Sequence, residues 1–435
     1  MEKAYDAAEF WSRDQIEATQ AVRLKNVVTR VWNGSPFYRK RLEEAGVTPE
    51  SIRSIADIER IPFTTKDDLR SQYPLNLVIV PHSKLVRLHC SSGTTGTPTA
   101  IAHTQNDLNV WADLMARCLH MVGVTKDDVF QNMSGYGLFT GGLGIHAGAE
   151  RLGCMTIPAG AGNTKRQIKL VKDFKTTVAH ILPSYALILG ERLREMGEDP
   201  RKLSLRIAVV GAEPYTEGFR KRIEDLFDMK VYNSYGLSEM NGPSVGFECR
   251  EQNGLHLWED AYLAEIIDPA TGRHVQPGEV GELVLTTLVR ESMPILRYRT
   301  RDLTTFIPGE CPCGRRHMRM GRIVGRADDM FICKGVNIYP SQIEEVLMKF
   351  KEVGKNYLIT LEDDGLGDLL RVKVEIREEC FVEDMRALQG LQQRIARRLK
   401  DEILVTPKVD LVQSNSLPVP EGKAVRFKDI RAEKM

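Results

Sequence analysis

The chain has 435 residues, a formal net charge of +1, 42% hydrophobic residues and 27% charged residues. This length predicts two or three domains, and the balanced charge excludes a strong electrostatic attraction to nucleic acid or to an anionic membrane. Because the sequence contains neither a signal-peptide pattern nor a typical membrane span, and its eight cysteines form no disulfide framework, we expect a cytoplasmic protein.

Residues 1–80 alternate charged helical stretches with short breaks, which predicts a mostly helical N-terminal segment. From residue 85, short apolar runs alternate with amphipathic ones. The predicted strands are 85–90, 128–133, 154–158, 176–182, 205–211 and 229–234, and the predicted helices are 105–121, 164–174, 184–196 and 215–227. This alternation is typical of an α/β fold with a mostly parallel sheet and crossover helices.

The pattern changes after residue 255, where two predicted strands flank a Gly/Pro-rich turn and indicate a β-rich subdomain over about 255–325. The remaining residues alternate strands with a long helix near 384–402, which predicts a small α+β domain. We therefore expect a large domain over residues 1–327 and a small C-terminal domain over residues 328–435.

Residues 90–99, "CSSGTTGTPT", follow the first predicted strand and combine glycines with hydroxyl side chains. Such a loop can bind phosphate oxygens, although a flexible surface turn is the alternative for the loop considered alone. The loop lacks the lysine that a nucleotide-hydrolase P-loop requires. The GxGxxA match at 142–147 lacks the expected acidic residue further along the chain, so we interpret it as a structural glycine-rich segment.

Five motifs occur in order: "SSGTTGTP" at 91–98, "NSYGLSE" at 233–239, "YRTRDL" at 298–303, "GRADDMFICKGVNIYP" at 325–340 and "EGKAVR" at 421–426. Together they resemble the acyl-adenylate-forming enzymes, which include acyl-CoA synthetases, luciferases and peptide-synthetase adenylation domains. The segments "GYGLFTGGLGIHAGAERLG" at 135–153 and "LPVPEGKAVR" at 417–426 are most similar to the phenylacetate–CoA ligases of that family. The resemblance implies ATP-dependent activation of a carboxylic acid as acyl-AMP, followed by transfer of the acyl group to coenzyme A.

The resemblance also implies a nucleotide site. The Gly/Thr loop would contact the β- and γ-phosphates, Ser238 would contact the α-phosphate in place of the family's usual threonine, and Glu239 would hold Mg²⁺. The Tyr235 ring would stack on adenine, while Asp302 would accept the ribose hydroxyls and Arg326 would also reach the ribose. A solvated surface acid is the alternative for Glu239, and a surface salt bridge is the alternative for Asp302 and Arg326. The predicted nucleotide-binding residues are Ser91, Ser92, Gly93, Thr94, Thr95, Gly96, Gly211, Ala212, Glu213, Asn233, Tyr235, Asp302 and Arg326.

The last two motifs supply groups for the two half-reactions that the resemblance implies. Lys423 would bridge the carboxylate and α-phosphate oxygens during adenylation. Asp328 would be a hinge about which the small domain changes its orientation before thioester formation. Lys334 and Gly335 would then line the coenzyme A channel, which a side chain at position 335 would narrow. The predicted catalytic residues are Lys423, Glu239 and Ser238.

An apolar pocket for the acyl group is predicted from the uncharged segment "GYGLFTGGLG". It lacks a cation that could pair with a second substrate carboxylate, and its aromatic residues suit an aryl ring such as that of phenylacetate. Ordinary core packing is the alternative for Tyr136 and Phe139. The predicted pocket residues are Tyr136, Phe139, Gly141, Ala212 and Pro214.

Four further residues have the chemistry of a metal site. Cys249, His256, Cys311 and Cys313 offer thiolate and imidazole ligands that suit tetrahedral Zn²⁺ in a structural role. The C-x-C spacing is tighter than the usual C-x-x-C, His317 is a rival fourth ligand, and free buried cysteines are the alternative to a metal.

Two other functions stay open at this point. The acyl group could pass to a carrier-protein thiol instead of coenzyme A, or the chain could be an inactive acyl-adenylate or nucleotide sensor. A sensor need not keep Lys423, Glu239 and Asp302 together, which favours the enzyme. We expect small-molecule partners only, namely an aryl acid, ATP and coenzyme A, without nucleic acid or membrane. The sequence fixes neither the acid nor the oligomeric state, and a homodimer stays open.

Overall fold

The computed structural model describes residues 4–91, 98–213, 215–327, 331–334, 336–363, 368–380, 385–417 and 426–431. Contacts divide the chain into two units, which we treat separately. The large unit is Met1–Leu182, Arg192–Ala212 and Phe227–Arg322, and the small unit is Pro183–Glu191, Glu213–Leu226 and Ile323–Met435. Asp328 lies outside the described residues, so the boundary between residues 327 and 328 stays a prediction.

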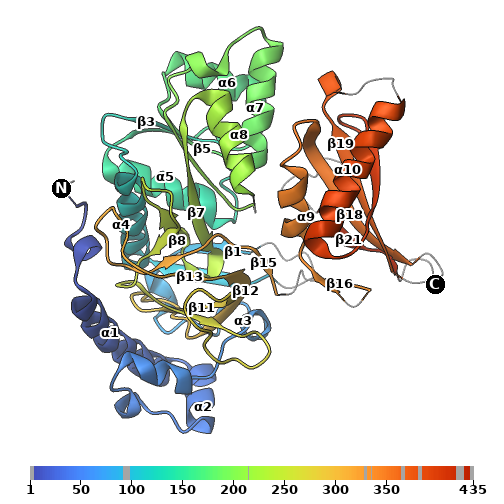
Figure 1. Ribbon diagram of the computed structural model, residues 1–435. Helices are drawn as coiled ribbons and strands as arrows, with labels where there is room; N and C mark the ends of the chain where they lie inside the picture. The colour runs from blue at the N-terminus through green and yellow to red at the C-terminus, as the bar shows by residue number, and fades with distance from the viewer. Residues whose placement is uncertain are drawn as a thin grey trace. The chain divides into compact units, whose positions relative to one another are not determined.

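The N-terminal segment of the large unit is mostly helical (Figure 1). Helix α1 (Arg13–Gly34) begins at Ser12, whose hydroxyl accepts a hydrogen bond from the Gln15 backbone while the Gln15 side chain accepts one from the Ser12 backbone. Helices α2 (Pro36–Glu44) and α3 (Lys66–Ser71) follow. Short 3₁₀ helices are η1 (Ala7–Phe10), η2 (Pro49–Ser51), η3 (Ile55–Arg60), η4 (His82–Lys84) and η5 (Pro200–Lys202).

A nine-stranded sheet forms the centre of the large unit, in the order β13-β14-β9-β8-β7-β6-β5-β3-β4. Its parallel part consists of β3 (Val129–Asn132), β4 (Met155–Ile157), β5 (Val178–His180), β6 (Ile207–Gly211) and β7 (Lys230–Leu237). Its antiparallel part consists of β8 (Gly242–Glu248), β9 (Leu255–Leu257), β13 (Phe306–Ile307) and β14 (Arg319–Met320). Every residue of β6, "IAVVG", is buried, as expected for a central parallel strand.

The helices between these strands are α4 (Gln105–Met121), α5 (Thr140–Leu152), α6 (Thr164–Asp173), α7 (Pro183–Glu195) and α8 (Glu217–Phe227). Their alternation with parallel strands confirms the predicted α/β fold class. Helices α4 and α5 lie side by side in the large unit (Figure 1). The contact division assigns most of α8 and the first part of α7 to the small unit.

The structure corrects the sequence analysis at two places. Strand β1 (Leu85–Cys90) pairs with β2 (Ala100–Thr104) in a separate antiparallel hairpin and is not part of the parallel sheet. Residues 140–152 form α5, although their glycines did not predict a helix. Tertiary packing explains this helix, because a Cβ at Gly144 would lie 2.3 Å from Cζ2 of Trp111 and one at Gly148 would lie 2.6 Å from Cγ of Met115. The glycines thus let α5 approach α4 closely.

After β9, the chain forms an antiparallel sheet from β10 (Tyr262–Ile267), β11 (Gly281–Thr287) and β12 (Tyr298–Thr304). Strands β10 and β11 are the two strands that the sequence predicts around the Gly/Pro-rich turn. All seven residues of β11 are buried, so this sheet is part of the core of the large unit. Strand β12 contributes two residues to the candidate site described below.

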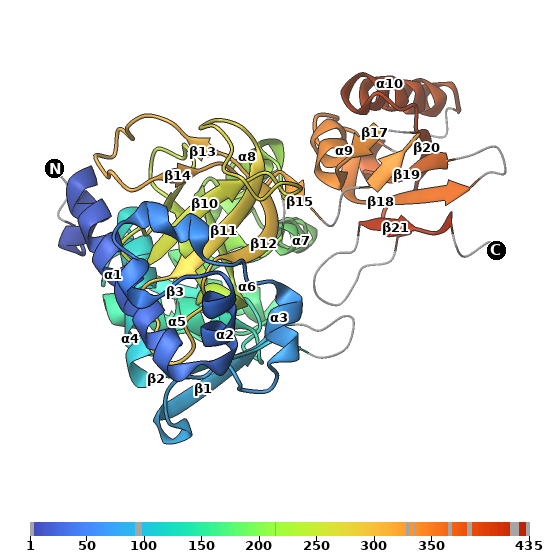
Figure 2. The same ribbon diagram turned by 90° about the horizontal axis from the view of Figure 1, so that it is seen from below.

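The small unit contains a four-stranded sheet in the order β20-β19-β18-β21, with α9 (Pro340–Leu347) and α10 (Met385–Ile403) on one face (Figure 2). Within its core, the Tyr357 hydroxyl donates to Oε2 of Glu344 at 2.6 Å, and Nη1 of Arg426 lies 3.4 Å from the same oxygen. The sheet strands are β18 (Val353–Asp363), β19 (Asp368–Ile376), β20 (Lys408–Val412) and β21 (Phe427–Asp429). The remaining elements are β15 (Gly325–Arg326), β16 (Phe331–Cys333), β17 (Val336–Ile338) and η7 (Glu378–Cys380).

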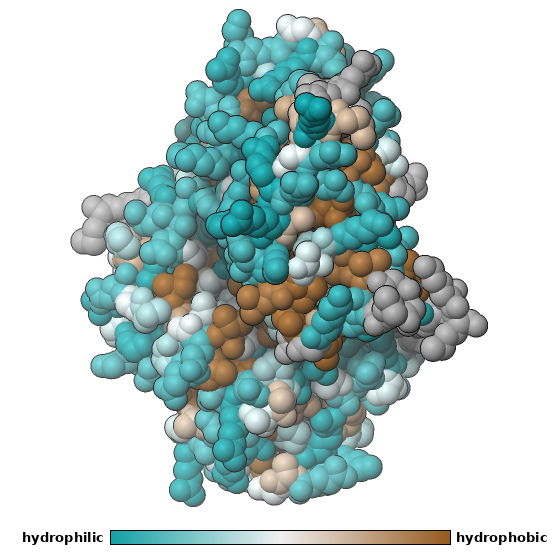
Figure 3. Space-filling view, turned by 45° about the vertical axis from the view of Figure 1, so that its right-hand side comes forward, coloured by the Kyte–Doolittle hydropathy of each residue, from teal (hydrophilic) through white to brown (hydrophobic). Residues whose placement is uncertain are grey.

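The surface is mixed in character. On the face seen in Figure 3, hydrophilic residues predominate and apolar residues form smaller patches between them. Among the helices of the described ranges, none has both the length and the apolar character that a membrane crossing requires.

Candidate functional site

The carboxyl ends of the parallel strands meet at one edge of the nine-stranded sheet, which is where open α/β sheets bind ligands. Asn132 ends β3 and is paired with His180, which ends β5. Nδ1 of His180 lies 2.8 Å from Oδ1 of Asn132 and 3.0 Å from Oγ of Ser134. The sequence analysis did not select these three residues, although a polar residue at the end of an apolar strand was the available signal.

Gly211 ends the next strand of the sheet, β6, and its position is tightly constrained. A Cβ there would lie 2.4 Å from the backbone oxygen of Ser234 on β7, so only glycine allows this approach. Ala212 follows with φ of 66°, a left-handed conformation that is uncommon for alanine and is among those enriched at functional sites. Glu213 belongs to the small unit, where its carboxylate accepts hydrogen bonds from the backbone and hydroxyl of Ser184 at 3.2 and 2.9 Å.

Glu239 lies in η6 (Ser238–Met240), directly after β7, and its side chain is buried. The Thr99 and Tyr298 hydroxyls each donate to Oε1 of Glu239 at 3.3 Å. Both hydroxyls contact the same oxygen, which leaves lone pairs of the carboxylate for a hard cation such as Mg²⁺. The buried position makes a solvated surface acid an unsuitable description of Glu239.

The predicted phosphate loop begins close to this carboxylate. The backbone N–H of Ser91 donates to the backbone oxygen of Thr99 at 3.0 Å, and the hydroxyls of the two residues are also in contact. Thr99 thereby joins the base of the loop to Glu239. Ser92, Gly93, Thr94, Thr95 and Gly96 lie outside the described residues.

Asp302 on β12 is joined to Tyr235 on β7. The Tyr235 hydroxyl donates to Oδ2 of Asp302 at 2.6 Å, so the tyrosine also orients the carboxylate predicted to bind ribose. Asn233, also on β7, donates its backbone N–H to Oε2 of Glu248 at 2.8 Å. Strand β12 therefore presents Tyr298 to Glu239 and Asp302 to Tyr235, which connects two motifs that are far apart in sequence.

The first turn of α5 lies beside Ser238. The Thr140 and Ser238 hydroxyl oxygens are 3.5 Å apart. Tyr136 is half-buried, and its hydroxyl lies 3.2 Å from Nδ1 of His146. Phe139 is 54% exposed, so core packing does not explain it. A Cβ at Gly141 would meet nothing within 4 Å, which leaves space at the start of this helix.

The remaining predicted residues belong to the small unit or to segments outside the description. Pro214, Asp328, Gly335 and Lys423 lie outside the described residues. Lys334 is exposed, and its backbone N–H donates to Oδ2 of Asp368 at 3.1 Å. Arg326 is half-buried in β15. The roles of these residues stay predictions.

The Cys/His set lies together in the large unit. The ligand atoms of Cys249, His256, Cys311 and Cys313 are all within 4.8 Å of one another. Both nitrogens of His317, the rival ligand, have other partners: Nδ1 accepts from the Glu259 backbone at 3.1 Å, and Nε2 donates to the Ala8 oxygen at 2.8 Å.

His180 should make stability depend on pH. Burial lowers the pKa of His180 to about 4, below its ordinary value of about 6.5. Because the unfolded chain binds the proton more readily, this contribution to stability is complete above about pH 6.5 and is lost as pH falls toward 4. We expect urea unfolding to show a loss of about 2–3 kcal/mol between pH 7 and 4.5 from this group. In His180→Gln, the decrease in the free energy of unfolding between pH 7 and 4.5 should be smaller by that amount. Equal decreases in the wild-type protein and the variant would contradict the lowered pKa of His180.

The carboxylates and hydroxyls that the described residues bring to this edge of the sheet are typical of an α/β enzyme that binds a phosphorylated ligand. Comparison with known families agrees: residues 18–288 match the AMP-binding enzyme model, and residues 335–431 match the AMP-binding enzyme C-terminal domain. The chain belongs to the AMP-binding, acyl-adenylate-forming enzyme family, on its phenylacetate–CoA ligase branch. The family resemblance seen in the sequence motifs is thereby confirmed.

The similarity to individual proteins extends over nearly the whole chain. The phenylacetate–coenzyme A ligase of Thermus thermophilus is 46% identical, with 96% of this chain and 97% of that protein covered. The enzyme of the same name from Escherichia coli is 42% identical over 98% and 97% of the two chains. A crystal structure of 2-hydroxyisobutyryl-CoA ligase, in complex with an acyl-AMP in the postadenylation state, superimposes with a TM-score of 0.92 at 32% identity, covering 98% of this chain and 92% of the other. The chain is an AMP-forming acid–thiol ligase.

Proposed function

We propose that this enzyme activates phenylacetate with ATP and transfers the phenylacetyl group to coenzyme A, releasing AMP and pyrophosphate. The observation that carries this proposal is the near-complete alignment with two proteins named phenylacetate–coenzyme A ligase. The buried carboxylate of Glu239 and the Tyr235–Asp302 pair support it, because they are groups of the kind that bind a cation and a ribose.

In the first half-reaction, a carboxylate oxygen of the acid attacks the α-phosphorus of ATP, and the bond to the bridging oxygen of pyrophosphate breaks. Negative charge develops on the α-phosphate and on the leaving group, so donors and a cation are required there. Ser238 offers a hydroxyl for the α-phosphate, and the loop that begins at Ser91 offers donors for pyrophosphate. Mg²⁺ held at Glu239 would neutralise phosphate charge. Lys423 is the proposed cation between the acid and the α-phosphate.

In the second half-reaction, the thiol sulfur of coenzyme A attacks the acyl carbon, a C–S bond forms, and the bond to the AMP oxygen breaks. Asp328 is the proposed hinge for the small domain between the two steps. Lys334 and Gly335 are proposed to line the channel through which the thiol reaches the acyl-adenylate.

The proposed function also specifies the cofactors, cellular location and partners of the enzyme. Its cofactors are ATP, coenzyme A and Mg²⁺, together with a structural Zn²⁺ that the reaction itself does not need. None of the eight cysteines is in a disulfide, which agrees with the proposed reduced, cytoplasmic location. The partners are small molecules, without nucleic acid or membrane, and a homodimer stays open.

Substrate preference tests the proposal directly. The pocket is proposed from Tyr136, Phe139 and Gly141, together with Ala212 and Pro214, whose apolar and uncharged side chains suit an aryl ring. Since each methylene-sized group in a fitted pocket contributes ~1–3 kcal/mol, phenylacetate should exceed acetate by ~10³-fold or more in kcat/KM. Coenzyme A-dependent AMP release would be measured for phenylacetate, benzoate, acetate and palmitate. A comparable kcat/KM for acetate would contradict phenylacetate as the preferred substrate. AMP release that does not depend on coenzyme A would contradict coenzyme A as the acyl acceptor.

A further inference from the structure

Four metal-binding atoms meet where the β8–β9 hairpin faces residues 311–313. Sγ of Cys249 lies 3.7 Å from Sγ of Cys311, and Sγ of Cys313 lies 3.4 Å from Nε2 of His256. Ligands placed tetrahedrally at about 2.3 Å for sulfur and about 2.0 Å for nitrogen would be separated by about 3.8 Å for two sulfurs and about 3.5 Å for sulfur and nitrogen. These two separations match a tetrahedral zinc site, and the ligand atoms of all four residues lie within 4.8 Å of one another. A disulfide would need sulfurs about 2.05 Å apart.

The turn "CPCG" explains the short spacing between two of the cysteines. The backbone N–H of Gly314 donates to the oxygen of Cys311 at 2.9 Å, which closes a four-residue β-turn. Pro312 occupies the second position of this turn, where proline is favoured, and Gly314 ends it with φ of 83°. The turn brings the thiols of Cys311 and Cys313 to the same side, where both approach the hairpin.

The imidazole of His256 is oriented as a ligand. Its Nδ1 lies 3.3 Å from the backbone oxygen of His317, and this contact requires Nδ1 to carry the proton. In the neutral imidazole, Nε2 is then the unprotonated nitrogen, and it lies 3.4 Å from Sγ of Cys313. Orientation of a metal-binding histidine by a backbone carbonyl is the usual arrangement at zinc sites.

We infer that Cys249, His256, Cys311 and Cys313 bind a structural Zn²⁺, and that this zinc site holds in place the loop that anchors the N-terminal turn of the protein. Four protein ligands leave no position for a substrate, so the site is structural and not catalytic. Cys249, His256 and Cys311 are buried, and Cys313 is half-buried. The inference does not depend on which acid the enzyme uses.

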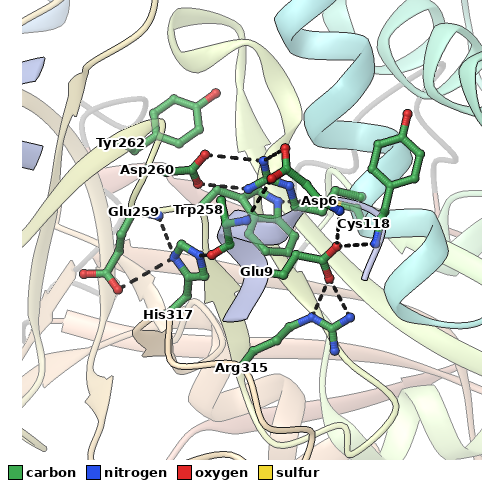
Figure 4. Close-up of polar contacts among 12 residues, drawn as sticks. Asp6, Glu9, Cys118, Trp258, Glu259, Asp260, Tyr262, Arg315 and His317 are labelled. Atoms are coloured by element: carbon green, nitrogen blue, oxygen red, sulfur yellow. Dashed lines mark hydrogen bonds and ion pairs between the residues drawn. The ribbon is translucent and has the colours of Figure 1, made fainter. Parts of the chain in front are cut away.

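The N-terminal turn is η1 (Ala7–Phe10), and it is attached through residues that follow the CPCG turn closely (Figure 4). Nη2 and Nε of Arg315 lie 2.6 and 2.8 Å from Oε2 of Glu9, whose side chain is fully buried. The Arg315 guanidinium also lies over the Phe10 ring, 5.0 Å from its centroid. His317 adds the hydrogen bond from its Nε2 to the oxygen of Ala8.

These contacts give the zinc site a mechanical consequence. Arg315 and His317 are two and four residues after Cys313, on a loop that belongs to no strand until β14. A zinc ion bound at Cys311 and Cys313 would fix the start of this loop against β8 and β9. Without the metal, the loop would lose this restraint and Arg315 would move relative to Glu9. The attraction between the two charges would then no longer offset the cost of burying them away from water.

Metal content and local protection test both parts of the inference. Elemental analysis of the purified enzyme should find about one Zn²⁺ per chain, as a single closed site requires. Cys313→Ser should lose the metal and melt at a lower temperature, whereas Cys380→Ser, which changes a cysteine outside the set, should keep the metal. Hydrogen exchange of a peptide covering residues 4–12 should become faster in Cys313→Ser, while exchange in α10 should not change.

A second measurement avoids variants that fail to fold. Treating the folded wild-type enzyme with an organomercurial should release zinc to a chromophoric chelator as the thiols react, and exchange at residues 4–12 should rise with the released zinc. Metal-free enzyme of full stability, or a Cys249–Cys311 disulfide in freshly purified enzyme, would overturn the zinc site. Zinc release with unchanged exchange at residues 4–12 would overturn its role as an anchor.

Discussion

Replacing Glu239 by glutamine should lower phenylacetate-dependent ATP–pyrophosphate exchange by ~10²–10³-fold, the cost typical of removing one preorganised charge-stabilising group. Glutamine has the same shape, and its amide oxygen can still accept from the Thr99 and Tyr298 hydroxyls. The substitution therefore removes the negative charge that would hold Mg²⁺, and it creates no cavity. The exchange rate should be measured over a range of Mg²⁺ concentrations, because a weakened cation site requires more metal.

Tyr298→Phe provides a graded control for this experiment. It removes one hydrogen bond to Oε1 of Glu239 but leaves the charge in place. We expect a smaller decrease in pyrophosphate exchange, of ~10- to 10²-fold, since a hydrogen bond to a charged group contributes about 1.5–3 kcal/mol. Wild-type exchange and an unchanged Mg²⁺ requirement in Glu239→Gln would show that this carboxylate does not serve the metal.

The second large effect should separate the two half-reactions. Lys423→Ala removes a cation matched to charge that develops during adenylation, so pyrophosphate exchange should fall by ~10²-fold or more. Thioester formation from supplied phenylacetyl-AMP should be largely preserved. Gly335→Leu should do the reverse, because a side chain in the proposed thiol channel would obstruct coenzyme A while the phosphate contacts stay intact.

Both half-reactions would be measured for both variants. Lys428→Ala is the matched control for Lys423→Ala, since Lys428 is an exposed lysine of the same segment, on β21. It should leave both rates unchanged. If Lys423→Ala and Gly335→Leu each depressed the two steps to the same extent, the proposed division between two domain orientations would be wrong for this enzyme.

Local patterns predicted the fold class well and the pairing of individual elements less well. The apolar runs that became β5 and β6 carry enough hydrophobic residues to identify buried parallel strands. The run that became β1 also has enough apolar residues to predict a strand, yet it pairs with β2 in a hairpin. Pairing depends on long-range geometry that a short run does not encode. Helix α5 was missed because glycine opposes helix formation locally, while contact with Trp111 favours it.

The candidate site shows the same limit. Glu239 was identified in the sequence as a motif residue, but Thr99 and Tyr298, whose hydroxyls donate to its carboxylate, were not. A single hydroxyl residue carries no signal until the fold brings it to a carboxylate, as Tyr298 on β12 is brought to Glu239 after β7. The Cys/His set was easier to recognise, because thiols and imidazoles are rare and chemically distinctive. Only the structure shows that His317 uses both of its nitrogens elsewhere.

The uneven packing of the α5 glycines has a consequence for engineering the enzyme by directed evolution. A Cβ at Gly142 would lie 2.3 Å from the backbone oxygen of Gly135, and one at Gly144 would collide with Trp111, so a mutant library gains little at these two positions. Gly141 faces open space, and a larger residue there could shorten the proposed acyl pocket without disturbing the helix contacts. A library randomised at position 141 and at the exposed Phe139 would therefore select variants that accept acids of different size. The glycines that pack against Gly135 and Trp111 would stay unchanged.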